Sequence, residues 1–123
     1  YVVSSHDGMD EIGLAGKSAF AFVENGLVTE GEIDPEAYGF TLGPKEAIQG
    51  GDAAFNAQIS RDIFSGKEQG AKRDIVVLNA AFALFANGGV KDIAEAIEKV
   101  KAQLESGKAT KHLQCIAEVS KGF

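Results

Sequence analysis

FAFVENGLVT, residues 20–29, holds two short runs of aromatic and β-branched residues on either side of Asn25-Gly26. An Asn-Gly pair between two such runs is a strong signal for a β-hairpin, because both residues tolerate the positive φ that a type I′ turn requires. The sequence therefore predicts strands at residues 20–23 and 27–29, joined by a tight turn.

The opening residues Tyr1-Val2-Val3 predict a further strand, which leads into the polar loop Ser4-Ser5-His6-Asp7-Gly8. This strand begins abruptly, and the chain has no initiator Met. We therefore expect residues 1–123 to be a single segment from the carboxy-terminal part of a larger α/β domain, whose other strands lie upstream.

Helix signals follow the strands. Asp34 before Pro35 predicts a helix start, because aspartate caps free amide groups and proline fits the first helical position. Asp52 predicts the cap of a second helix that ends near Phe64, where Gly66 stands in the position that commonly closes a helix.

Three later segments complete the helical half. Residues 74–86 are apolar nearly all round, which predicts a helix in the centre of the fold. Residues 92–106 carry apolar side chains at three-and-four spacing, which predicts an amphipathic helix. A final helix is predicted to bury Leu113, Ile116 and Ala117. The predicted fold class is α/β, with strands and a β-hairpin first and then four or five helices packed on the sheet.

The composition limits the classes of function. Lys and Arg total 12 against 18 Asp and Glu, a net charge of −6, which argues against nucleic acid as a partner because such binding depends on clustered cations. A single cysteine excludes an internal disulfide and any multi-cysteine metal site. No apolar stretch reaches the roughly 20 residues that span a bilayer, and no secretory signal opens the chain, so we expect a cytoplasmic protein without a membrane partner.

Gly16-Lys17-Ser18 resembles the end of a phosphate-binding P-loop. That motif requires a glycine five positions before Gly16, where this chain has Glu11, and a helix after the serine, where this chain has strand-forming residues. We therefore interpret these residues as an ordinary turn.

The acidic cluster Asp7-Gly8-Met9-Asp10-Glu11 is the best chemical candidate, because it places three carboxylates in the loop after a predicted strand. Ligands of open α/β sheets bind beyond the carboxyl ends of strands. Mg²⁺ favours one or two carboxylates together with substrate phosphates and water, and the adjacent Asp10 and Glu11 could supply that pair. The alternative is a solvated acidic loop without a ligand.

Other polar residues favour structural interpretations. Asn56 and Asn79 lie on predicted helices with apolar surroundings, where a buried asparagine must find hydrogen-bond partners. His112 and Cys115 are three residues apart on one helix, but a lone cysteine on an apolar helix is more typical of core packing than of a nucleophile. Asp52, after Gly50-Gly51, occupies the position that an anion would take at the helix start, which favours a cap.

In order along the chain, these features resemble the carboxy-terminal third of the anthranilate phosphoribosyltransferase family. The resemblance covers essentially all 123 residues, and no single motif carries it alone. The matching elements are Val2-Val3 leading to Asp7-Gly8-Met9-Asp10-Glu11-Ile12, then Gly50-Gly51-Asp52-Ala53-Ala54 with Asn56-Ala57, then Arg73-Asp74 followed by Val77-Leu78-Asn79-Ala80-Ala81, and finally an amphipathic helix ending in Ser106-Gly107.

The resemblance implies an enzyme of tryptophan biosynthesis that transfers the phosphoribosyl group of phosphoribosyl pyrophosphate to anthranilate and releases pyrophosphate. It implies that Asp10 and Glu11 bind Mg²⁺, which in turn holds the pyrophosphate, and that Asp7 shapes the loop. It also implies a homodimer when the protein is full length, formed mainly through an amino-terminal helical domain that these residues do not include.

The family's glycine-rich phosphate loop, its Lys-His-Gly-Asn segment and its anthranilate-binding arginine do not occur here, so we expect the chain alone to be inactive. The family usually carries His-Gly after the two valines, whereas this chain has Ser4-Ser5 and then His6. The alternatives are a pyrimidine nucleoside phosphorylase-like enzyme, which shares the fold but needs no such metal pair, and a non-catalytic binding module.

Overall fold

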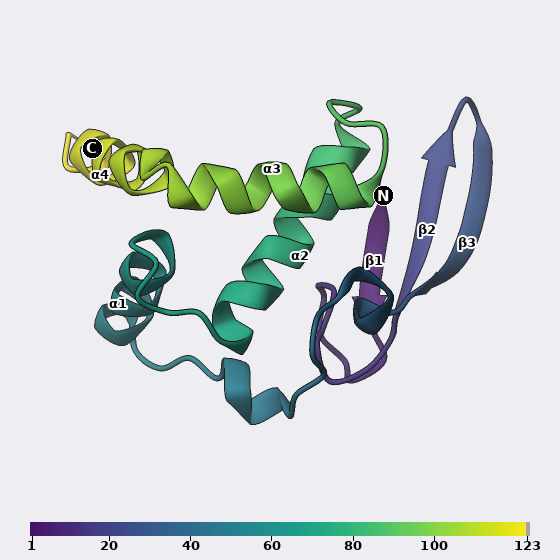
Figure 1. Cartoon of the computed structure of the whole chain (residues 1–123), viewed down its shortest axis with the longest axis horizontal. Coiled ribbons are helices and arrows are strands. Elements are labelled where there is room, and N and C mark those ends of the chain that lie inside the picture. Colours follow the sequence, from purple (N-terminus) through teal and green to yellow (C-terminus); the bar gives the residue numbers. More distant parts are fainter. Residues whose placement is uncertain (123) are drawn as a thin grey trace.

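The computed structural model describes residues 1–122, which form a small sheet followed by a series of helices. The predicted order of strands first and helices second is confirmed (Figure 1). The elements are β1 (Val2–Ser5), β2 (Ser18–Glu24), β3 (Leu27–Ile33), two short 3₁₀ helices η1 (Pro35–Tyr38) and η2 (Lys45–Ile48), and four α-helices, α1 (Ala53–Phe64), α2 (Ala71–Ala86), α3 (Ile93–Glu105) and α4 (Lys108–Ser120).

The sheet is antiparallel, with strand order β1-β2-β3. The predicted hairpin is confirmed, because Asn25 (φ 50°) and Gly26 (φ 77°) occupy its two turn positions with the positive φ of a type I′ turn. Both hairpin strands are longer than the predicted runs, since polar residues such as Glu32 continue the ladder on the exposed side of β3.

Aromatic packing joins the sheet to the helices. The ring of Tyr1 lies 5.3 Å from that of Phe20 and 5.0 Å from that of Phe22 on β2. It also meets Phe82 on α2 edge-on at 5.6 Å, a favoured geometry for aromatic pairs. Helix α2 therefore lies in the centre of the fold, as predicted. Its buried residues are Ile75, Val77, Leu78, Ala81 and Phe82.

The other helices extend the core away from the sheet. Helix α3 crosses α2 and contributes the buried Ala96 and Ile97 to the same core, and α1 and α4 lie at the far end from the sheet (Figure 1). The packing on the sheet therefore comes from α2, whereas α3 and α4 pack on other helices. The cap predicted at Asp52 is confirmed, because its carboxylate accepts a hydrogen bond from the Phe55 amide at 2.8 Å.

Two predicted helix limits were inexact. Pro35 and the residues after it form a single 3₁₀ turn rather than a longer helix, because Gly39 adopts a left-handed φ of 82° and ends it. Helix α2 begins at Ala71, three residues before Asp74, because Gly70 precedes it in an extended conformation and nothing in the first turn breaks a helix.

The prediction for the last helix was wrong. Leu113 is half-buried, but Ile116 is 53% exposed and Ala117 is exposed as well. Helix α4 is anchored near its start, where the Thr110 hydroxyl donates to the Phe64 carbonyl at 2.9 Å. Within residues 1–122 nothing covers the remainder of its apolar face, so Cys115 is also exposed rather than part of the core.

Candidate functional site

The loop between β1 and β2 carries the acidic cluster, and hydrogen bonds to Ser5 set its entry. The Ser5 amide donates to the Met9 carbonyl at 3.0 Å, and the Gly8 amide donates to the Ser5 carbonyl at 3.1 Å. Gly8 has a φ of 91°, a conformation that side-chain-bearing residues rarely adopt. The chain therefore turns tightly from the end of β1 and is fixed again at Met9.

Asp7 stabilises this turn from within. Its carboxylate accepts hydrogen bonds from the Ser5 hydroxyl and from the Met9 amide, and the Lys45 ammonium donates to its carbonyl at 3.2 Å. The Ser5 hydrogen bond is the largest cause that lowers the pKa of Asp7, and the Met9 amide and Lys45 act in the same direction. These contacts agree with a role for Asp7 in shaping the loop.

The exit of the loop is held by side chains from elsewhere in the fold. Ile12 is buried, and the Asn79 side chain on α2 pairs with its backbone: Oδ1 accepts from the Ile12 amide and Nδ2 donates to the Ile12 carbonyl, both at 2.9 Å. The next amide, that of Gly13, donates to the Ser18 hydroxyl at 3.1 Å. The loop is therefore fixed on its carboxyl side as well.

Asp10 and Glu11 lie between these two fixed ends, and both are exposed. Among residues 1–122 no hydrogen bond or ion pair involves either carboxylate, so both are free to bind a cation. The same residues contain no group of three or more His, Cys, Asp or Glu side chains that could hold a metal ion. Two adjacent carboxylates fit Mg²⁺, which completes its coordination with water and substrate phosphates.

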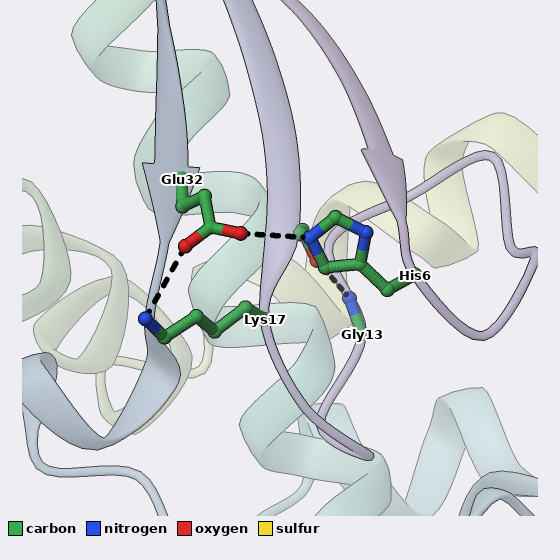
Figure 2. Close-up of polar contacts among 5 residues, drawn as sticks. His6, Gly13, Lys17 and Glu32 are labelled. Carbon is green, nitrogen blue, oxygen red and sulfur yellow. Dashed lines mark hydrogen bonds and ion pairs between the residues drawn. The ribbon is translucent and has the colours of Figure 1, made fainter.

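The basic side chains of the loop make other contacts, shown in Figure 2. His6 Nε2 lies 3.1 Å from Glu32 Oε1, and Lys17 Nζ lies 3.2 Å from Glu32 Oε2. The hydrogen bond from His6 and then the pairing with Lys17 lower the pKa of Glu32. Gly16 lies in a bend, and Ser18 begins β2 rather than a helix, so the exclusion of a phosphate-binding P-loop is confirmed.

Both asparagines have structural roles, as predicted, although Asn56 is exposed and Asn79 is half-buried rather than buried. Asn56 pairs with the backbone of Gly51, accepting from its amide at 2.8 Å and donating to its carbonyl at 3.0 Å. Asn79 makes the same kind of pair with Ile12. The sequence did not predict that Asn79 reaches the acidic loop, although a lone polar residue in the apolar run between Ile75 and Ala86 was a signal that it has a specific partner.

Several curated proteins are similar to this chain in sequence. The anthranilate phosphoribosyltransferase of Rubrobacter xylanophilus is 42% identical over 120 residues, which cover 98% of this chain and 35% of that protein. The anthranilate phosphoribosyltransferase of Geobacter sp. strain M21 is 46% identical over 114 residues, covering 93% of this chain and 32% of that protein. The chain therefore spans about a third of the length of the curated relatives it matches.

Solved structures match the fold. The Saccharomyces cerevisiae anthranilate phosphoribosyltransferase in complex with 4-fluoroanthranilate matches with a TM-score of 0.88 at 21% identity, over 98% of this chain and 35% of that chain. The same yeast enzyme in complex with PRPP and Mg matches with a TM-score of 0.82 at 22% identity, over 91% of this chain and 32% of that one. The anthranilate phosphoribosyltransferase of Thermus thermophilus matches with a TM-score of 0.81 at 30% identity, over 91% of this chain and 32% of that chain.

The likeness to these structures defines the class: the chain has the fold of a segment of an α/β enzyme domain, with a paired-carboxylate loop after its first strand. The family described as the glycosyl transferase family, a/b domain, matches residues 1–110. The chain belongs to this family.

Proposed function

We propose that the chain is part of an anthranilate phosphoribosyltransferase, which transfers the phosphoribosyl group of phosphoribosyl pyrophosphate to anthranilate and releases pyrophosphate. The observation that carries the proposal is the identity of 42% and 46% to curated enzymes of this name over nearly the whole chain. The free carboxylate pair of the loop after β1 supports it, because a pyrophosphate substrate needs a cation to neutralise its charge.

In this proposal Asp10 and Glu11 bind Mg²⁺ together with the pyrophosphate group. Bound Mg²⁺ supplies electrostatic stabilisation of the negative charge that grows on pyrophosphate as it leaves and the ribose becomes oxocarbenium-like. The two carboxylates then fix where the pyrophosphate lies, and the Ser5-Met9 and Ile12-Asn79 contacts on either side keep the carboxylates in place.

We further propose that residues 1–123 form a single segment of the α/β domain of a homodimeric, cytoplasmic enzyme of tryptophan biosynthesis. No helix among residues 1–122 is long and apolar enough to cross a membrane. The residues that recognise anthranilate and the sugar phosphate lie in other parts of the intact protein, so the 123-residue chain alone is expected to have no activity.

The test uses the intact protein that contains this chain. Asp10→Asn and Glu11→Gln remove one charge each while keeping the side-chain size, so both should weaken the Mg²⁺-dependent binding of phosphoribosyl pyrophosphate and slow the formation of phosphoribosyl-anthranilate. Glu105→Gln is a matched control, because Glu105 is an exposed carboxylate at the end of α3. Binding is measured by calorimetry, and turnover by the loss of anthranilate fluorescence.

Unchanged affinity and rate in both loop variants would remove the metal assignment. Phosphate-dependent cleavage of a pyrimidine nucleoside without added metal would indicate a nucleoside phosphorylase instead. Neither activity, in an intact protein that folds, would indicate a binding module.

A further inference from the structure

The most specific polar contact between the helices and the candidate site is the one between Asn79 and Ile12. Three hydrogen bonds use this amide side chain: one from the Ile12 amide, one to the Ile12 carbonyl, and one to the Ile75 carbonyl one turn earlier on α2, each at 2.9 Å. Both amide protons of Nδ2 are thereby used. The side chain has one orientation that satisfies all three partners.

The contact is buried on the side of Ile12 and half-buried on the side of Asn79. Ile12 is 1% exposed, so its backbone groups have little access to water as an alternative partner. Asn79 follows Leu78, which is fully buried on α2. A buried amide or carbonyl without a hydrogen-bond partner costs free energy. The backbone of Ile12 is therefore held within hydrogen-bond distance of Asn79.

This places the carboxylate pair in a short span between fixed points. Met9 is hydrogen-bonded to Ser5 on one side, and Ile12 is hydrogen-bonded to Asn79 on the other. Only Asp10 and Glu11 lie between them. Because consecutive Cα atoms are about 3.8 Å apart, a displacement of Ile12 passes directly to both carboxylates.

Mg²⁺ tolerates such displacement poorly. It requires near-octahedral oxygen ligands at about 2.0–2.1 Å. Replacement of side chains that orient metal ligands without touching the metal is known to alter metal affinity. A helix with a packed apolar surface, such as α2, is a rigid base for that orientation.

We propose that Asn79 is a positioning residue, which fixes the Asp10–Glu11 pair for metal binding by pairing with the backbone of Ile12; Ser18, through the Gly13 amide, supports it. This inference rests on the proposed function. Asn79 touches neither carboxylate, so its effect on metal binding passes through the backbone of the loop.

The main variant is Asn79→Asp in the intact protein. It keeps the size and one acceptor oxygen, but it replaces the Nδ2 donor with an oxygen that faces the Ile12 carbonyl. Asn56→Asp is the matched control, because Asn56 makes the same two-bond pair with the backbone of Gly51. Each variant replaces an Nδ2 donor by an oxygen in a two-bond pair with the backbone. Of the two pairs, the one with Ile12 lies next to the carboxylates.

The readout is binding of Mn²⁺, a spectroscopic substitute for Mg²⁺, titrated by electron paramagnetic resonance in the presence of phosphoribosyl pyrophosphate. Asn79→Asp should weaken Mn²⁺ binding by about 10–100-fold, the range found for residues that orient metal ligands, and Asn56→Asp should leave it unchanged. The KM for anthranilate should stay constant in both variants. A change in this KM would indicate a general loss of structure rather than an effect on metal binding.

Ser18→Ala is a milder second variant, which removes only the acceptor of the Gly13 amide. The loss of one neutral hydrogen bond should weaken Mn²⁺ binding by about fivefold, and this variant decides the question if Asn79→Asp does not fold. Unchanged Mn²⁺ binding in the folded Asn79 variant, or an equal loss in Asn56→Asp, would overturn the inference. If the unaltered protein itself binds no Mn²⁺ with phosphoribosyl pyrophosphate, it is the proposed function that fails.

Discussion

Replacement of Phe82 by alanine tests whether α2 and the sheet form one core. Phe82 is 4% exposed, and its ring meets those of Tyr1 and Tyr38 edge-on at 5.6 and 5.7 Å. It lies three residues after Asn79 on the same helix. Its removal leaves a cavity at the junction of sheet and helix, where the position of the acidic loop is set.

The expected loss is large. A buried Phe→Ala replacement costs about 3–5 kcal/mol of unfolding free energy, a substantial part of the roughly 5–15 kcal/mol that stabilises a domain. Phe55→Ala is the matched control, because Phe55 is 53% exposed on α1. Its half-buried ring should contribute only about 1 kcal/mol.

Urea unfolding of the 123-residue chain, followed by circular dichroism, measures the difference. With a slope of about 2 kcal/mol/M, a loss of about 4 kcal/mol lowers the midpoint by about 2 M for Phe82→Ala, against about 0.5 M for Phe55→Ala. Similar midpoints for the two variants would refute the packing described here and, with it, the rigid base assigned to Asn79.

Three other predictions follow from local contacts. Asp52→Ala removes the cap on the Phe55 amide and should cost about 1 kcal/mol in urea unfolding. Ser5→Ala should raise the pKa of Asp7, measured by NMR titration. Because the folded-state pKa of Asp7 lies below its ordinary value, the stability that Ser5 confers should be present at pH 7 and decline as the pH falls below about 4. Cys115, which is exposed, should react with a thiol reagent in the native chain as fast as in urea.

Much of the fold could be predicted because its signals are local. Asn25-Gly26 determines its turn through backbone conformations that few other residues adopt, and Asp52 caps its helix through an amide three residues away. The apolar run of α2 indicated a central helix because a helix that is apolar nearly all round, and too short to span a membrane, is stabilised by burial in a protein core. Asp10 and Glu11 were predicted as metal ligands from residue type and resemblance, and their metal binding stays a prediction.

What could not be predicted depends on contacts between distant parts of the chain. Asn79 and Ile12 are 67 residues apart, and no periodicity relates them. The apolar face of α4 has the same three-and-four spacing as that of α3, yet Ile116 is exposed whereas Ile97 is buried. The spacing shows that a face is apolar, and only the arrangement of the other helices decides whether anything covers it.

The three carboxylates of the loop are not equivalent. Asp7 is hydrogen-bonded within the loop, and Lys45 donates to its carbonyl. His6 and Lys17 both face Glu32 on β3. The basic side chains that could neutralise the loop therefore have other partners.

That arrangement leaves negative charge concentrated at Asp10 and Glu11. Within residues 1–122 no basic side chain pairs with either carboxylate, which fits the Mg²⁺ site of the proposed function. A flexible loop could separate the two charges. Here the backbone is fixed at Met9 before the pair and at Ile12 after it, so in the proposed function both carboxylates would be presented to the cation from one short, fixed segment.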